Sequence, residues 1–187
     1  MSAAAPTAAA HGENRLRISR LGLWLFFLSE TCLFGTFAAA RFYMNGTHTP
    51  DELNQLLGLV LTSILLVSSL TAYRAETAIA HGNNEHGRLM LLATMVLGVI
   101  FLSGVIVEWS IAEFVPSEGY GTSFFSMTGL HASHVATGVF FLGLAYLFAS
   151  RGKYSPGSHW GVTGVVMYWH FVDVVWVFFY PALYLVS

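Results

Sequence analysis

The chain has 187 residues, of which 55% are hydrophobic, 15% are aromatic and only 10% are charged. A soluble domain carries about a quarter charged residues, so lipid and not water is the expected solvent. The formal net charge of −2 gives no basic field for nucleic acid, and we expect no nucleic-acid partner. The single cysteine, Cys32, excludes an internal disulfide and a cysteine-based metal site.

The N-terminal segment, residues 1–19, begins rich in alanine and polar residues and has no apolar periodicity, which predicts a flexible tail. A membrane-spanning helix needs about 20 mostly apolar residues. Such windows occur at 21–43, 56–79, 89–112, 124–149 and 161–186. We therefore expect an all-α fold, an integral membrane bundle of five transmembrane helices that forms one domain over residues 20–187. The short connections favour an up-and-down arrangement.

The basic residues predict an orientation, because loops rich in Lys and Arg stay on the cytoplasmic side. If the N-terminus lies in the cytoplasm, all of the eight Lys and Arg residues except Arg41 lie at the inner face. Five spans then place the C-terminus on the opposite side, which is the periplasm in a bacterial cell.

Ionisable residues inside membrane spans are costly and are candidates for function. At the helical rise of about 1.5 Å per residue, five of them lie roughly 12 to 18 Å from a membrane face, in one layer near the middle. They are Glu30, His131, His134, His170 and Asp173. Glu108 lies near the outer end of its span, where it can be solvated, and we rank it below Glu30.

Two interpretations of this layer are compatible with the spacing, in which His131 with His134, and His170 with Asp173, form i, i+3 pairs. Imidazole and carboxylate groups that converge from several helices can bind a metal or a haem. The same groups can instead hydrogen-bond to one another and fix the register of the helices. One H-x-x-H motif is an incomplete ligand set for a di-iron bundle.

Two further patterns predict packing. The stripe of Trp169, Trp176 and Phe179 is expected to lie in the core or at an interface, because aromatic side chains dominate both. The small residues Gly129, Ser133 and Thr137 recur every four positions, a spacing that favours close helix contact.

Several motifs resemble those of the cytochrome c oxidase subunit III family. Residues 168–176, Y-W-H-F-V-D-V-V-W, are similar to its last-helix signature, and residues 129–135, G-L-H-A-S-H-V, are similar to the preceding G-F-H-G-x-H-V element. Residues 24–34, W-L-F-F-L-S-E-T-C-L-F, resemble the family helix that carries a buried carboxylate. The chain departs from the pattern at Leu130 and Ala132, where Phe and Gly are usual, and at Val105, where many members have Gln.

The resemblance covers about residues 20–187 and implies the short, five-helix form found in bacterial oxidases. It implies a non-catalytic subunit of a proton-pumping haem-copper oxygen reductase in the aerobic respiratory chain, located in the bacterial inner membrane. Haem and copper are expected in partner subunits and no metal or other redox centre in this chain. Subunits I and II are the implied protein partners, and phospholipid is an implied ligand.

The resemblance also assigns roles. Glu30 is implied to be the buried carboxylate near the side of proton entry, and we expect it to be largely protonated. His131, His134, His170 and Asp173 are implied to form a polar layer that holds the helices together, supporting complex stability and proton uptake by the catalytic subunit. No residue is expected to be catalytic.

Three alternatives stay open. Subunit III of a quinol-oxidising enzyme shares these motifs and the five-helix form. An independent membrane metalloenzyme or b-type cytochrome would need a full ligand set, and the chain offers no second H-x-x-H and no E-x-x-H. The third alternative is an oxidase-like accessory protein of nitric oxide reduction.

Overall fold

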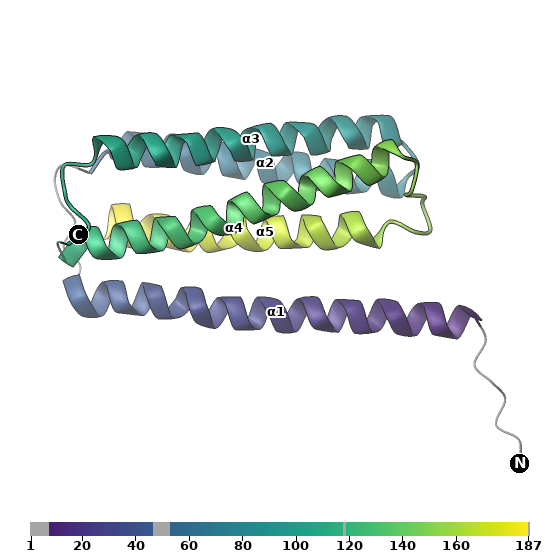
Figure 1. Ribbon diagram of the computed structural model, residues 1–187, viewed down its shortest axis with the longest axis horizontal. Helices are drawn as coiled ribbons and strands as arrows, with labels where there is room; N and C mark the ends of the chain where they lie inside the picture. The colour runs from purple at the N-terminus through teal and green to yellow at the C-terminus, as the bar shows by residue number, and fades with distance from the viewer. Residues whose placement is uncertain (1–7, 47–52, 118, 187) are drawn as a thin grey trace, which may run out of the picture.

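The computed structural model describes residues 8–46, 53–117 and 119–186. Five α-helices run up and down in a bundle (Figure 1). They are α1 (Ala8–Asn45), α2 (Gln55–Ala80), α3 (Asn84–Ile111), α4 (Gly119–Ser150) and α5 (Trp160–Tyr180), and a π-helical turn, η1 (Pro181–Leu185), follows α5. Each of the five is long and apolar enough to cross a membrane. The predicted all-α fold with five spans is therefore confirmed.

The first helix is longer than expected. It begins at Ala8, within the segment 1–19 that was predicted to be a flexible tail. Residues 13–20 are exposed, so packing does not account for the added turns. Alanine has the highest helix propensity, and a helix nucleated by the apolar span extends at little cost. Residues 1–7 lie outside the described part of the chain.

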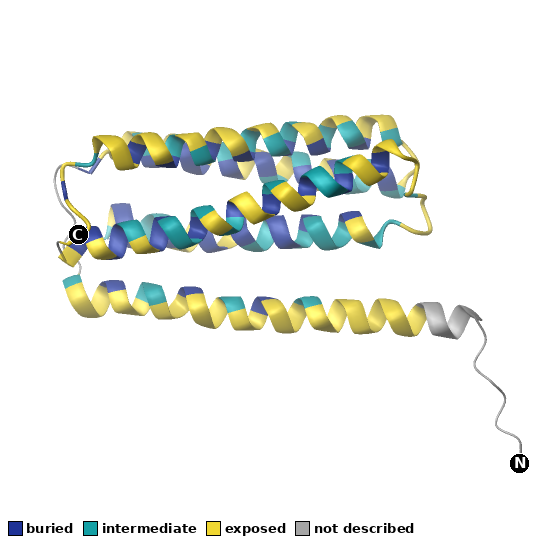
Figure 2. Ribbon diagram, in the orientation of Figure 1, coloured by how far each residue is buried: buried dark blue, intermediate teal, exposed yellow. Residues whose placement is uncertain are grey.

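The helices are not equally embedded in the bundle. Helix α1 packs mainly on α4 and α5, whereas α2 and α3 form a close hairpin on the far side of α5. Figure 2 shows α1 as exposed along most of its length, while α5 is buried at many positions. The start of α1 and the end of α5 lie at opposite ends of the bundle, as an odd number of spans requires (Figure 1).

The core is organised around the aromatic stripe of α5, whose predicted packing role is confirmed. Trp169 and Trp176 are almost fully buried. Their indole N–H groups donate to Ser68 Oγ at 2.9 Å and to Thr62 Oγ1 at 3.0 Å, both on α2. Because a buried indole N–H needs an acceptor, these two bonds fix α5 against α2.

Two glycines make room for the indole of Trp169. A Cβ atom on Gly98 of α3 would lie 2.7 Å from the ring, and one on Gly138 of α4 would lie 2.8 Å from it. Both distances are shorter than any normal contact. The close packing of α3, α4 and α5 therefore depends on the missing side chains at these two positions.

Candidate functional site

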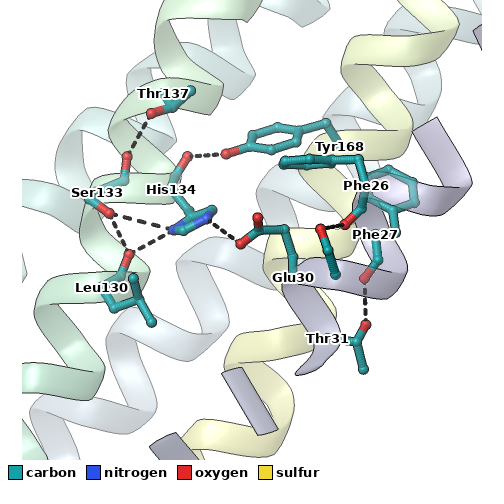
Figure 3. Close-up of polar contacts among 10 residues, drawn as sticks. Phe26, Phe27, Glu30, Thr31, Leu130, Ser133, His134, Thr137 and Tyr168 are labelled. Carbon is teal, nitrogen blue, oxygen red and sulfur yellow. Dashed lines mark hydrogen bonds and ion pairs between the residues drawn. The ribbon is translucent and has the colours of Figure 1, made fainter. Parts of the chain in front are cut away.

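A carboxylate and an imidazole meet between α1 and α4 (Figure 3). Glu30 Oε2 lies 3.1 Å from His134 Nε2. The two side chains are 17% and 16% exposed, so the pair is partly buried and not sealed from its surroundings. The pair joins α1 to α4 and brings together two residues that were predicted for the polar layer.

The hydrogen bonds of His134 determine how many protons the pair holds. His134 Nδ1 lies 2.9 Å from the carbonyl oxygen of Leu130, one turn earlier on α4. A carbonyl oxygen can only accept, so Nδ1 must carry a hydrogen. The contact between Nε2 and Glu30 then needs one further proton, which sits either on the imidazole or on the carboxyl. The contact therefore places a single proton between the two side chains.

Aromatic side chains hold the pair in place. The Tyr168 hydroxyl of α5 donates to the carbonyl oxygen of His134 at 3.0 Å (Figure 3). The ring of Phe34 meets the imidazole of His134 edge-on, with 4.8 Å between the ring centroids. Phe34 of α1 thus packs on the imidazole itself, and Tyr168 of α5 binds the backbone that carries it.

The pair lies at the wall of a groove between α1, α4 and α5. The groove has a volume of about 570 Å³, and its lining is mostly apolar, with Leu23, Phe26 and Val165 among its residues. Trp160 lines the end nearest the start of α5, and the Arg20 guanidinium lies 5.4 Å from the centre of its ring. The groove therefore combines an apolar body, a cation at one end and the Glu30–His134 pair along its wall.

A second polar cluster lies between α2 and α5. His170 Nδ1 is 2.6 Å from Ser69 Oγ. Asp173, one turn further along α5, is buried near the same serine, but neither carboxyl oxygen makes a hydrogen bond within the described residues. This cluster does not include Glu30 or His134.

His131 belongs to neither cluster. It is fully buried, and its Nε2 lies 3.1 Å from the carbonyl oxygen of Val172 on α5. Its ring packs against those of Trp176 and Phe101, with centroids 4.7 and 5.6 Å away. The imidazole thus joins α4 to the α5 backbone from within the aromatic core.

The five predicted residues therefore occupy three separate positions. Glu30 and His134 are hydrogen-bonded to each other. The other three, His131, His170 and Asp173, lie elsewhere in the bundle. Within the described ranges, no group of three or more His, Cys, Asp or Glu side chains is arranged to hold a metal ion. The hydrogen bonds that these residues do make connect α1 to α4, α2 to α5 and α4 to α5.

The expectation that Glu108 is solvated is wrong. Its side chain is 3% exposed, and the Tyr184 hydroxyl donates to Oε1 at 2.8 Å. The cause is η1: Pro181 follows α5, and the wider π-helical turn brings Tyr184 to the interior. Depth along α3 alone did not reveal this contact.

Sequence reasoning also missed the surroundings of Arg41, which it placed at the outer face as a lone charge. Arg41 is fully buried. It donates to the carbonyl oxygen of Gly46 at 2.8 Å, and its guanidinium lies 5.0 Å from the ring centre of Tyr120. The sequence feature that could have indicated this contact is the aromatic residue Tyr120, near the start of the fourth span.

Comparison with known proteins agrees with the motifs. The family model described as cytochrome c oxidase subunit III matches residues 2–187. The chain is 35% identical to cytochrome c oxidase subunit 3 of Papio hamadryas over 178 residues, which is 88% of this chain and 68% of that protein. It is 34% identical to the subunit 3 proteins of Litocranius walleri and Antilope cervicapra over 187 residues, 93% of this chain and 72% of each relative. The chain therefore belongs to the cytochrome c oxidase subunit III family and is a multi-pass membrane subunit of a haem-copper oxidase.

Proposed function

We propose that this chain assists proton uptake by the catalytic subunit of a proton-pumping oxygen reductase and stabilises the complex, without a redox centre or a catalytic residue of its own. The observation that carries this proposal is the Glu30–His134 pair, in which one proton lies between an imidazole and a carboxyl group at the wall of a groove. Asp, Glu and His side chains inside membranes form proton relays, which is why we assign the proton role to this pair.

The same groove supports a role in lipid binding. Helix α1 has grooves on both sides, the one of about 570 Å³ beside α4 and one of about 470 Å³ lined by residues of α1 and α5, such as Trp24 and Phe171. Phospholipid chains fit these apolar surfaces, and Arg20 offers a charge for a phosphate headgroup. Lipid in both grooves would hold α1, which has little protein contact, against the bundle.

The remaining assignments follow from the charge pattern and the family. We place the N-terminus in the cytoplasm and the C-terminus in the periplasm of a bacterial inner membrane. Subunit I is the proposed neighbour in the membrane, with subunit II in the same complex, and both haem and copper belong to these partners. Exposed apolar residues of α1 and α2, among them Leu28, Leu66 and Leu70, suit contact with lipid or another membrane subunit.

A hydrophobic carbodiimide is expected to modify Glu30 before Glu113. The reagent needs a protonated carboxyl and an apolar route to it. Glu30 shares a proton with His134 and lines an apolar groove, whereas Glu113 is exposed. Peptide mass mapping after brief exposure measures the ratio, and Glu30→Gln provides the blank. Equal modification of both carboxyls would contradict the shared-proton description of the pair.

The isolated chain is expected to contain no stoichiometric haem, iron or copper after purification in mild detergent, because its five midplane groups occupy three separate positions. Absorption spectroscopy and elemental analysis measure this. A Soret band that disappears in His131→Ala or His170→Ala would identify a cytochrome and overturn the subunit assignment.

A further inference from the structure

A small cavity lies beside the end of α3. Figure 1 shows that α3 ends at the same end of the bundle as α5. Its volume is about 210 Å³. Its polar lining consists of Asn54, Glu108 and Glu113, from the start of α2, the last turn of α3 and the segment after α3. The Glu30–His134 pair does not line this cavity, so the proposed proton role leaves it unexplained.

One oxygen of Glu108 is held and the other is free. Oε1 accepts the hydrogen bond of Tyr184, while Oε2 is buried and has no hydrogen-bond partner in the described part of the chain. The side chain as a whole is 3% exposed. A buried carboxyl oxygen without a partner is costly, so a ligand that Oε2 can bind would offset a real penalty.

The other groups around the cavity are oxygen donors as well. Asn54 Oδ1 accepts from the backbone N–H of Leu57 at 3.0 Å and keeps a second lone pair. Glu113 is exposed, so its carboxylate can close over the cavity from the rim. The last carbonyl oxygens of α3 lack intrahelical partners, and a helix C-terminus carries partial negative charge.

We propose that this cavity binds a calcium ion. Glu108 Oε2 is the buried ligand, Glu113 is the ligand at the rim, and Asn54, the terminal carbonyls of α3 and water complete the coordination. Two carboxylates balance the charge of the ion, and a set made only of oxygens is what calcium prefers. The bound ion would tie the end of α3 to the start of α2 and, through Tyr184, to η1.

The affinity is expected to be low, with a dissociation constant of about 10⁻⁴ to 10⁻³ M, which is the range of weak extracellular calcium modules. Only two carboxylates contribute, and one of them, Glu113, is exposed at the surface. On the proposed topology the cavity faces the periplasm, where an ion of this affinity can be bound and exchanged.

Terbium luminescence tests the site in the purified oxidase complex. After treatment with a chelator, Tb³⁺ is titrated with excitation of aromatic side chains, because Tyr184 lies against the proposed ligand and can sensitise the ion. We expect saturable emission that calcium displaces. Glu108→Gln should weaken the binding component at least tenfold and Glu113→Gln several-fold, while Glu85→Gln, an exposed carboxylate at the other end of α3, should change nothing.

A second measurement uses thermal stability. Calcium in the millimolar range is expected to raise the melting temperature of the wild-type subunit and of Glu85→Gln, but not that of Glu108→Gln. If Glu108→Gln fails to assemble, Glu113→Gln carries the test, because an exposed rim residue is not needed for folding. Unchanged terbium binding and an unchanged calcium response in the assembled variants would overturn the proposal and leave water as the ligand of Oε2.

Discussion

Replacing Trp169 with alanine is expected to destabilise the subunit by about 3 to 5 kcal/mol, the range for removing a large aromatic side chain from a packed interior. Trp169 is fully buried between Gly98 and Gly138 and donates to Ser68. Its removal leaves a cavity that three helices line. It also leaves the Ser68 hydroxyl without the donor that now fixes α5 to α2.

The effect in a membrane comes from lost packing and not from transfer to water, because lipid is as apolar as the core. Detergent-based thermal unfolding of the purified chain measures it. The matched control is Trp24→Ala, because Trp24 is 60% exposed on α1. A melting temperature that falls equally in both variants would mean that the buried indole of Trp169 contributes no more to stability than the exposed indole of Trp24.

The fold was predictable because a membrane leaves few choices. Backbone groups in lipid must pair within the segment, so each long apolar window has to be a helix. The expected spans from 56–79 onward differ from the observed helices by a few residues at each end. The start of α1 differed more, because hydropathy does not report the helix propensity of the alanine-rich segment that precedes the span.

The members of the polar layer were predictable, but their partners were not. Three residues on a helix amount to a rotation of about 300°, so His131 and His134 point about 60° apart. His131 therefore reaches the backbone of α5, and His134 reaches Glu30 on α1. Spacing places two side chains on one side of a helix, but it does not determine which neighbouring helix each one meets.

The small-residue ridge shows the same difficulty. Ser133 and Thr137 are exposed and line the groove beside α1, so they do not make the close helix contact that was expected. The close approach occurs at Gly138, one position further along α4, where the indole of Trp169 lies against the backbone. A pattern of small residues indicates where contact is possible, and the large side chain that uses it comes from another helix.

Glu108 was misjudged because its partner lies far along the chain. The contact with Tyr184 depends on the π-helical turn after Pro181, and a π-helical turn has no reliable sequence signal. Depth along a span predicts access to water only for a straight helix without neighbours.

The oxidase complex that carries Glu30→Gln is expected to assemble normally and to lose turnover several-fold at alkaline pH, with little loss near neutral pH. Glutamine has the shape of glutamate, and its amide can donate to His134 Nε2 while Leu130 still accepts from Nδ1. The link between α1 and α4 therefore survives. What the variant lacks is the shared proton, and its loss matters most when protons in solution are scarce.

Steady-state oxygen consumption across a pH series, with proton release measured in vesicles, tests this expectation. Glu85→Gln is the matched control, because it removes an exposed carboxylate that lines neither groove beside α1. His134→Gln should give the same alkaline loss as Glu30→Gln, and the double variant should be no worse than either single one, because each of the three removes the proton that lies between the two side chains. A normal pH profile in an assembled Glu30→Gln complex would instead make the pair a structural link between α1 and α4.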